Sequence, residues 1–569
     1  MKKQNNRVDQ IKKEWWKEGV LYQIYPRSFK DGNGDGVGDL KGILEKLDYL
    51  QDLGITMIWL SPIYQSPNDD NGYDISDYEA IMEEFGTMKD FDLLLIGTHV
   101  REMKLIMDLV VNHTSDQHRW FQEALKSKDS PYRDYYIWKS PIDGGPPNNW
   151  KSYFGGSAWE YEKSSGEYYL HLFSKKQPDL NWENEKLRQD IYKMMRFWLD
   201  KGVDGFRMDV IPLISKQPEF PSYKFEEIPG GLSGAYSFGP RMHEYLQEMN
   251  KEVLSKYDMV SVGEGVGVVP ENALSMVGED RNELNMVFHF DHMHMGRDDQ
   301  DKFVTVEWEL PEFKKIFREW DQALGNSGWG AIYLGNHDSP RMISKYGHSE
   351  GFKLASAKLL ATLLFTMRGT PCIYNGDEIG MTNLKFSDIN SYKDIESLNY
   401  YQEKIEEGEE PQEILERLYH QSRDNARTPM QWSPFKHGGF SDAAETWIKV
   451  NPNFSRINVE QSQKDQRSIL QYYKKLIELR KTLPTLVYGG YEDIYPQDKE
   501  IHAFIRHDDD YKLLVVLNFA DRILRFHLPG PIKEYPWKPI MRNYFEPLIQ
   551  PSLGEWVLKP YEAGIYVLD

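Results

Sequence analysis

Three carboxyl side chains each stand near the end of a strand-like apolar run: Asp209 in GFRMDV, Glu264 in MVSVGE and Asp338 in AIYLGNHD. Cleaving an acetal requires a nucleophile or base, an acid for the departing oxygen, and charge stabilisation around an oxocarbenium-like transition state. Carboxyl groups perform all three tasks. A single Asp or Glu after a strand commonly caps a helix instead. Three of them in one repeating architecture, with Arg207 and His337 alongside, indicate carbohydrate chemistry.

Short apolar runs that read as strands alternate with amphipathic runs that read as helices. Eight strands are predicted, at 19–25, 55–60, 105–111, 205–210, 259–264, 286–291, 331–336 and 371–376. Between them lie helical runs such as LKGILEKLDYLQDLG and LRQDIYKMMRFWLDKG, the second ending in a Gly suited to a C-cap. The pattern predicts an α/β fold, a (β/α)8 TIM barrel. Active sites of such barrels form at the C-terminal ends of the strands, where the three carboxylates fall.

The chain has 569 residues, more than one barrel needs. Residues 114–185, rich in Trp, Tyr, Gly and Pro, are too many for a simple connection and predict a subdomain inserted after the third strand. A second insertion, about 381–430, carries the acidic run EKIEEGEEPQEILERL, expected to form a solvated helix face. Runs such as IHAFIRH and KLLVVLNF predict a small antiparallel β domain over 488–569. The barrel itself is assigned to 1–113 and 186–487.

The composition excludes several classes of partner. A net charge of −21 and a pI near 5.3 argue against nucleic acid and anionic membranes, which require a basic face. No apolar segment follows MKKQNNRVDQIKKEWW and no long uncharged stretch occurs, so we expect no signal peptide, no membrane span and a cytoplasmic protein. The single cysteine, Cys372, excludes an intramolecular disulfide and is expected in the core. A small neutral sugar is the expected partner, and nothing in the composition specifies an oligomeric state.

Four ordered segments, DLVVNH, GFRMDV, SVGE and GNHD, resemble the signatures of the α-amylase superfamily of glycoside hydrolases, and QPDLNW at 177–182 resembles a fifth. Within that superfamily the chain is most similar to oligo-1,6-glucosidases and related α-glucosidases, through NGYDISDY, RDNARTPMQW and GMTN. The resemblance covers essentially the whole chain. It implies that Asp209 is a nucleophile that forms a covalent glucosyl-enzyme, that Glu264 acts first as acid and then as base, and that Asp338 stabilises the bound sugar. Retention of anomeric configuration follows.

Physical chemistry requires the same division of roles. A nucleophile must be ionised, and Arg207, two residues before Asp209 on the same strand face, is placed to keep it charged. Glu264 must hold a proton near neutral pH, so its site should raise its pKa. Asp108 in DLVVNH is expected to support the site, and an ion pair with Arg207 is one arrangement that would do so.

The resemblance also implies a set of substrate-binding residues. They are Asp70, Tyr73, His113, Phe173, Gln177, Arg207, His337 and Arg427. The two histidines would bind glucose hydroxyls and the aromatic rings would form sugar platforms. Asp70 and Arg427 would pair across the inner end of the pocket and close it, which implies an exo-acting enzyme.

Substrate choice is predicted from fewer residues. In the resembling family, Val after the nucleophile accompanies a preference for α-1,6 links, so Val210 favours isomaltose-type substrates, although a β-branched residue also suits a strand end. Ser339 and Gly265 stand where relatives often carry larger or amide side chains that face the leaving group. The acceptor side is therefore expected to differ from those relatives.

Three alternative functions remain open. Sucrose isomerases carry an RLDRD-like loop, and the corresponding segment here is His294, Met295, Gly296, Arg297 and Asp298. Because only its last two residues match, hydrolysis outranks isomerisation, with isomerisation or cleavage of sucrose as the alternative. Trehalose-6-phosphate hydrolases share the MDV-like strand, but no cationic cluster for a phosphate is visible. Non-catalytic amino-acid-transporter heavy chains keep the fold, yet they lack a full catalytic set and have a membrane anchor.

The segment DGNGDGVGD indicates one metal site. Its ligands would be Asp31, Asn33, Asp35, the carbonyl of Val37, and Asp39. Oxygen ligands at alternating positions suit Ca²⁺. The twelfth position is Gly42 rather than the bidentate Glu of an EF-hand, and a plain Gly-rich turn would fit the same letters. The resemblance to oligo-1,6-glucosidases favours a structural Ca²⁺, whereas catalysis by this mechanism needs neither a metal nor an organic cofactor.

Overall fold

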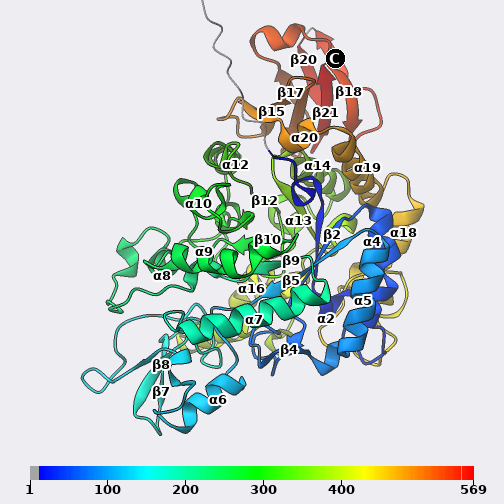
Figure 1. The fold of residues 1–569 in the computed structure, drawn as a ribbon. Helices are drawn as coiled ribbons and strands as arrows, with labels where there is room; N and C mark the ends of the chain where they lie inside the picture. The colour runs from blue at the N-terminus through cyan, green and yellow to red at the C-terminus, as the bar shows by residue number, and fades with distance from the viewer. Residues whose placement is uncertain (1–11, 553, 569) are drawn as a thin grey trace, which may run out of the picture.

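A computed structural model describes residues 12–552 and 554–568 (Figure 1). The first eleven residues, part of the segment used to predict that no signal peptide is present, lie outside the described residues. Eight parallel strands form one sheet in the order β11-β10-β9-β5-β2-β1-β13-β12, and a parallel bridge between Val287 and Gly330 joins its two edges. The strands are β1 (Leu21–Ile24), β2 (Met57–Leu60), β5 (Lys104–Leu109), β9 (Gly205–Met208), β10 (Val260–Glu264), β11 (Met286–Phe288), β12 (Ala331–Ile332) and β13 (Thr370–Tyr374). The predicted barrel is confirmed.

The barrel strands are buried on both faces. Every residue of β1, β2, β9 and β10 is buried, because one face packs inside the barrel and the other against the surrounding helices. All eight strands are shorter than predicted, and the difference is largest for the seventh: we expected 331–336, but β12 ends at Ile332. Beyond it the chain forms a turn that satisfies its own backbone, since the Asn336 amide oxygen accepts the N–H of Asp338 and the Ser339 hydroxyl accepts that of Asn336. The turn takes Asp338 out of the sheet.

Amphipathic helices surround the barrel (Figure 1). They include α3 (Leu40–Glu45), α4 (Leu47–Leu53), α5 (Met88–Val100), α7 (Glu185–Lys201), α9 (Met242–Glu252), α10 (Pro270–Val277), α12 (Leu310–Leu324), α14 (Lys353–Thr366) and α19 (Ile469–Thr482). In α7 the Asn184 side chain accepts the N–H of Leu187, and Gly202 ends the helix at φ 107°, as the sequence predicts. The buried stripe of α7 includes Ile191 and Trp198, so its packing against the barrel follows from its periodicity.

Two insertions stand over the carboxyl ends of the strands. The first contains α6 (Arg119–Lys126) and a three-stranded sheet of β6 (Trp138–Lys139), β8 (Glu167–Leu170) and β7 (Trp159–Glu162). The second contains α15 (Ile395–Glu406), α16 (Pro411–Gln421) and α17 (Asp424–Arg427). Gly408 at φ 88° separates α15 from α16, so the acidic run forms two helices rather than one. Both insertions are attached where a barrel active site is expected.

The C-terminal part forms the predicted antiparallel β structure (orange to red in Figure 1). One sheet has the order β14 (Gly490–Ile494), β15 (Ile501–His507), β16 (Lys512–Asn518), β21 (Ala563–Leu568) and β18 (Lys538–Arg542). A second contains β17 (Leu524–His527), β20 (Glu555–Leu558) and β19 (Ile549–Ser552). The fully buried Arg506 guanidinium fixes the first sheet to the barrel by donating to the Thr366 carbonyl at the end of α14 and to that of Gly489. Among the described residues, no helix has the length and hydropathy needed to cross a bilayer.

Two buried histidines follow β11. His289 stacks on Trp320 of α12 at 4.3 Å between ring centroids, and His292 lies 4.9 Å from His289. Burial lowers the pKa of His289 to about 3 and that of His292 well below its usual value, the His292 shift being reinforced by His289. Both rings are therefore neutral in the folded protein at neutral pH.

Acid should destabilise the protein through these rings. A histidine whose pKa is depressed by folding stabilises the folded state above its unfolded pKa, near 6.5, and loses that contribution as the pH falls toward 3. For His289 we expect a loss of about 2 kcal/mol at pH 5 relative to pH 7. Urea unfolding of His289→Phe, which keeps the stacking ring, should show a flatter pH dependence over this range. The same substitution at the exposed His420 should leave the dependence unchanged, and equal slopes for wild type and His289→Phe would contradict the assignment.

Candidate active site

The site is built around one buried guanidinium, that of Arg207 in β9. Its Nη1 lies 2.8 Å from the carboxylates of both Asp108 and Asp209, and its Nη2 lies 2.7 Å from that of Glu264. The Arg207 side chain is only 3% exposed. Burial alone would lower the pKa of Arg207, but the charges of Asp108 and Glu264 raise it well above its usual value. The expected ion pair between Asp108 and Arg207 is present.

Asp209 and Glu264 both contact this cation. Burial, followed by the charge of Glu264, raises the pKa of Asp209 well above its usual value despite Arg207. Arg207 thus offsets only part of the effect of burial and of Glu264, so the expectation that it keeps Asp209 charged is not supported by this cluster. The N–H of Val210 donates to Oε2 of Glu264 at 2.8 Å. The residue that follows Asp209 is therefore hydrogen-bonded to the Glu264 carboxyl.

Val210 makes this contact from a strained backbone. Its φ is 36° and its ψ 37°, in the left-handed region, which a β-branched residue rarely adopts. Such a conformation costs on the order of 1–3 kcal/mol and persists where the surroundings impose it. The side chain of Val210 lines the cavity described below.

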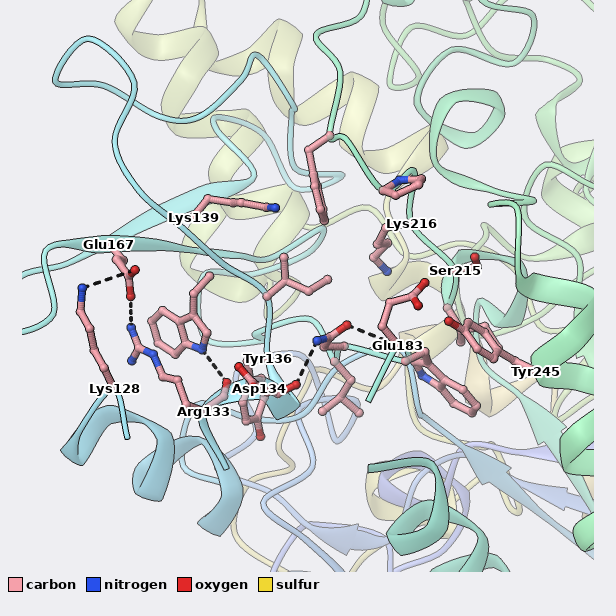
Figure 2. Close-up of a pocket in the computed structure, with 18 residues that line it drawn as sticks. Lys128, Arg133, Asp134, Tyr136, Lys139, Glu167, Glu183, Ser215, Lys216 and Tyr245 are labelled. Carbon is pink, nitrogen blue, oxygen red and sulfur yellow. Dashed lines mark hydrogen bonds and ion pairs between the residues drawn. The ribbon is translucent and has the colours of Figure 1, made fainter. Parts of the chain in front are cut away.

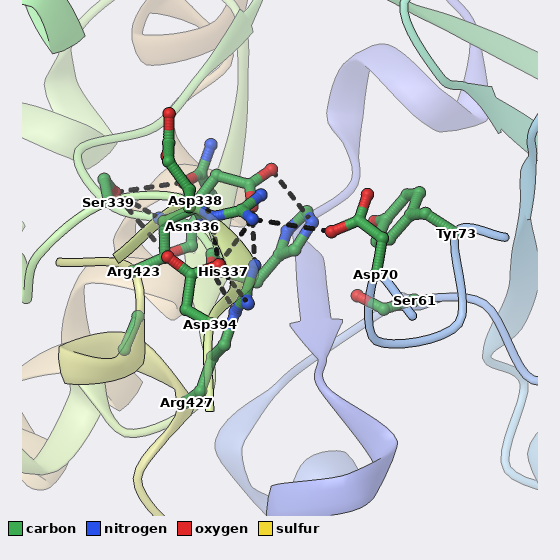
Figure 3. A network of polar contacts seen from close by, with 12 residues as sticks. Ser61, Asp70, Tyr73, Asn336, His337, Asp338, Ser339, Asp394, Arg423 and Arg427 are labelled. Atoms are coloured by element: carbon green, nitrogen blue, oxygen red, sulfur yellow. Dashed lines mark hydrogen bonds and ion pairs between the residues drawn. The ribbon is translucent and has the colours of Figure 1, made fainter. Parts of the chain in front are cut away.

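Asp338 lies in a different electrostatic environment (Figure 3). Arg427 and Arg423 reach its Oδ1 at 2.9 and 3.2 Å, and Nε2 of His337 lies 3.1 Å from its Oδ2. Burial would raise the pKa of Asp338, but His337 and the two arginines lower it below its usual range. Asp338 therefore stays ionised, whereas burial and the Glu264 charge oppose ionisation of Asp209.

The expected pair of Asp70 and Arg427 is wrong. Asp70 contacts Arg423 at 3.4 Å, one helical turn before Arg427. The donors of Arg427 are directed elsewhere, to the His337 carbonyl at 3.1 Å, to Asp338 and to Asp394 at 3.3 Å. Burial raises the pKa of Asp70 to about 7, even though both arginines lower it. The ion pair at this end of the pocket is thus made by Asp70 and Arg423.

A cavity of about 220 Å³ opens over these groups. Nine residues named from the sequence line it: Asp70, Tyr73, His113, Phe173, Asp209, Val210, Glu264, His294 and Asp338. Burial lowers the pKa of His113 to about 4, so it lines the cavity as a neutral imidazole. The wall combines aromatic rings, carboxyl groups and a neutral imidazole, which suits a neutral ligand rich in hydroxyls.

The other four predicted substrate-binding residues lie behind this wall: Gln177, Arg207, His337 and Arg427. The Gln177 amide lies 3.1 Å from Asp70 Oδ2 and 3.2 Å from His113 Nε2. The His337 ring stacks on Tyr73 at 5.2 Å with an interplanar angle of 5°. These four residues orient the lining groups, so their predicted direct contact with substrate is not supported by their positions.

Several lining residues were not identified from the sequence. They are Tyr153, Phe154, Ser233, Val266, Gly267, Phe290, Lys302, Glu396 and Arg423. Arg423 stands in the quoted motif RDNARTPMQW, four residues before Arg427, so its helical spacing was a usable signal. Lys302, in the loop after β11, forms an ion pair with Glu396 of the second insertion, and no sequence spacing connects them.

Ser339 and Gly265, where relatives often carry larger side chains that face the leaving group, do not line this cavity. The Ser339 hydroxyl is buried and bonds Asn336 Oδ1 at 3.0 Å. A Cβ on Gly265 would lie 2.6 Å from the Phe288 carbonyl and 2.8 Å from Val287, so any side chain there would collide with β11. Both residues shape the turns that follow their strands.

The loop proposed for Ca²⁺ has an oxygen-only donor set. Its turns are held by N–H donors: Asp31 accepts from Gly34 at 2.6 Å and Gly36 at 2.9 Å, and Asp39 caps α3 through Gly42 at 2.6 Å. Within residues 12–552 and 554–568, no group of three or more His, Cys, Asp or Glu side chains is arranged to hold a metal. A cation would therefore depend on the Asn33 amide and Val37 carbonyl beside the carboxylates. That set of hard oxygens fits Ca²⁺ in chemical type.

A (β/α)8 barrel with paired carboxyls and an ionised Asp at the carboxyl ends of its strands defines a carbohydrate-active enzyme. Residues 23–489 match the α-amylase catalytic domain, and the chain belongs to this family of glycoside hydrolases. It is 53% identical to oligo-1,6-glucosidase of Parageobacillus thermoglucosidasius, over 98% of this chain and 99% of that one.

Solved structures agree with this family. The chain superposes with a TM-score of 0.95 on an isomaltulose synthase variant from Erwinia rhapontici NX5 solved with its natural substrate sucrose, at 45% identity and covering 98% of this chain and 99% of that one. For a trehalose-6-phosphate hydrolase variant from Bacillus licheniformis the TM-score is 0.93, at 47% identity and covering 98% and 100%. Relatives with different reactions thus share this fold.

Replacing Arg207 should expose its role in holding three buried carboxyls. We expect Arg207→Met to lower the free energy of unfolding by about 3–5 kcal/mol at pH 7, because it leaves Asp108, Asp209 and Glu264 without their cation. Unpaired buried carboxyls have raised pKa values and protonate as the pH falls, so the deficit should shrink between pH 7 and pH 5. Urea unfolding at both pH values measures this.

The matched control is Arg101→Met, which removes an arginine paired with the 81% exposed Asp48. It should change the free energy of unfolding by less than about 1 kcal/mol. A pH-independent deficit in Arg207→Met would mean that lost packing, rather than lost charge compensation, causes the destabilisation.

Proposed function

We propose that this protein is a retaining, exo-acting α-glucosidase that hydrolyses short α-1,6-linked glucosides of the isomaltose type. The observation that carries the proposal is that the carboxyls of Asp209 and Glu264 both contact Arg207 at the strand ends, with Asp338 held ionised by His337, Arg423 and Arg427. Glycoside hydrolysis with retention uses two carboxyl groups, one as nucleophile and one as acid and then base. The high identity to oligo-1,6-glucosidases over nearly the whole chain supports the same reaction.

The chemistry proceeds in two steps. The Asp209 carboxylate attacks the anomeric carbon while the Glu264 carboxyl gives its proton to the departing glycosidic oxygen, leaving a glucosyl-enzyme ester. Glu264, now ionised, takes a proton from water, whose oxygen attacks the anomeric carbon and releases Asp209. Glu264 gives one proton in the first step and regains one from water in the second, so the cycle closes. Asp338, held ionised by Arg427 and Arg423, would bind sugar hydroxyls and stabilise the positive charge of the transition state.

The pocket's shape supports exo action. Asp70 and Arg423 contact each other across one end of the cavity, and the stacked rings of Tyr73 and His337 lie on the barrel side. A terminal glucose would fill the space between this end and Asp209. Substrate would therefore enter with its non-reducing end first.

The acceptor side is formed by residues of both insertions and the loop after β11. Val210 lines the cavity next to the nucleophile, and Lys302 and Glu396 form an ion pair on its wall. The ammonium and carboxylate can bind hydroxyls of the second sugar, since they offer donors and acceptors. The α-1,6 preference itself is proposed from Val210, as the family resemblance implies.

Sucrose isomerisation is the second candidate. It is favoured by the TM-score of 0.95 to isomaltulose synthases and by the position of His294, which lines the cavity. Hydrolysis is preferred because only Arg297 and Asp298 of the 294–298 segment match the isomerase loop.

Removing either catalytic carboxyl should abolish turnover. We expect Asp209→Asn and Glu264→Gln each to lower kcat by several orders of magnitude, about 10³-fold or more, with the thermal midpoint nearly unchanged. Asp204→Asn is the control, since Asp204 precedes β9 at its amino end, where it pairs with Lys104 at 2.8 Å. Near-wild-type kcat in either catalytic variant would remove that residue from the mechanism.

A substrate panel tests the reaction itself. The purified enzyme is incubated separately with isomaltose, maltose, sucrose and trehalose 6-phosphate, and the products are separated by chromatography. Glucose released chiefly from isomaltose, with the α-anomer first seen by NMR, is the expected result. Isomaltulose or trehalulose from sucrose would replace this function with isomerisation.

We also propose that the loop of Asp31, Asn33, Asp35, Val37 and Asp39 holds a structural Ca²⁺, and that the protein is cytoplasmic. The oxygen-only donor set supports the first. The single buried thiol of Cys372, which leaves no disulfide to form within the chain, is compatible with the second.

Chelation tests the metal. EDTA treatment should remove about one Ca²⁺ per chain, measured by atomic emission, and lower the thermal midpoint by several degrees, because binding to the folded state alone stabilises it. Asp35→Ala should abolish the Ca²⁺ content and the EDTA effect, whereas Asp52→Ala on the surface should change neither. Unchanged metal content and midpoint after chelation would reject the site.

A further inference from the structure

A second cavity, of about 500 Å³, lies between the first insertion and the segment that follows the nucleophile (Figure 2). Residues from 128–139 and Glu167 line it on the insertion side. Residues from 214–220 and Tyr245 of α9 line it on the barrel side, and 180–183 lie between them. It shares no lining residue with the catalytic cavity. It is therefore a separate site rather than an extension of the active-site pocket.

Most charges around this second cavity are already compensated. The pairs are Lys128 and Arg133 with Glu167 at 3.4 and 2.6 Å, Lys216 with Asp179 at 2.7 Å, and Glu183 with Arg241. A strongly anionic ligand would find no cluster of free cations among these residues. A neutral, polar ligand fits the charge balance.

The remaining polar groups face each other across the space. Lys139 enters from the insertion with its ammonium 4.3 Å from the centre of the Phe220 ring, and Tyr245 faces the space from α9 (Figure 2). The Tyr245 hydroxyl is fully buried. Burial and then the adjacent Glu183 carboxylate raise the pKa of Tyr245, but no hydrogen bond of ordinary geometry engages the hydroxyl within the described structure. A buried hydroxyl without a partner costs about 1–3 kcal/mol unless a ligand or water satisfies it.

The rest of the wall is apolar. Ile137, Leu180, Ile214 and Pro218 line the cavity between the polar groups. A pyranose ring presents C–H groups on its faces and hydroxyls at its rim. This cavity has an apolar wall bordered by an ammonium, a hydroxyl and a carboxylate. A pyranose therefore fits it better than a purely apolar ligand would.

The geometry points to a second sugar-binding site, which takes a short neutral glucoside between Lys139 and Tyr245. The inference rests on the proposed action on glucosides, which makes such ligands available to the protein. The site also adjoins the catalytic machinery: Lys216 on its wall holds Asn112 at 2.7 Å as well as Asp179, and Asn112 contacts His113 at 3.2 Å. The ligand would thus lie against segments that form the catalytic pocket.

The test separates the two sites by blocking the catalytic one. Wild-type enzyme is saturated with an iminosugar mimic of glucose and titrated with isomaltose in a calorimeter. One isomaltose per chain should still bind. Lys139→Met and Tyr245→Phe should each weaken this binding about tenfold, the loss expected for one hydrogen bond to a charged or buried partner.

Tyr192→Phe is the matched control. Its hydroxyl on α7 is likewise buried without a hydrogen bond, but it does not line the cavity, so binding should be unchanged. Absence of isomaltose binding to the blocked enzyme, or unchanged binding in both cavity variants, would overturn the proposal. The readout does not depend on cleavage: a chain that fails to hydrolyse isomaltose but binds it here would reject the proposed activity and keep the second site.

Discussion

The active site depends on a single buried guanidinium and on the strand register that delivers carboxyls to it. In the parallel ladder, Asp108 of β5 pairs directly with Arg207 of β9, and Val262 of β10 pairs with the same residue, which leaves Glu264 two positions further along β10. Asp209 follows Arg207 by two residues, so the two side chains point to the same side of the chain. Three carboxyls converge on one cation because the barrel fixes the strands side by side. Such a buried cluster is tolerated only while its charges remain paired.

Around this centre the protein gives three acidic groups two different environments. Burial and the charge of Glu264 oppose ionisation of Asp209, whereas Asp338 is surrounded by His337, Arg423 and Arg427 and stays ionised. Groups of the same chemical type thereby become suited to different tasks. The left-handed backbone of Val210 belongs to this arrangement, since its N–H reaches Glu264.

The insertions determine what the centre acts on. Phe173 and Tyr153 come from the first insertion, Glu396 and Arg423 from the second, and Lys302 from the loop after β11, and together they narrow the mouth above the strands. The same first insertion, where it meets residues 214–220, encloses the second cavity. Both cavities therefore form at junctions between segments distant in sequence, whereas the carboxyl cluster around Arg207 is formed by the barrel strands.

The sequence by itself determined the barrel, all eight of its strand positions, the antiparallel C-terminal part, and the carboxyls at the strand ends. It did so because buried strands, capped helices and glycine stops leave local periodic signals, as Asn184 and Gly202 do around α7. Tertiary structure alone decided that Asp70 pairs with Arg423, that Gln177 and His337 lie behind the wall, that β12 ends at Ile332, and that Lys302 meets Glu396. Those contacts join segments whose separation in the chain has no period, so they are set by how the insertions pack over the barrel rather than by any local pattern.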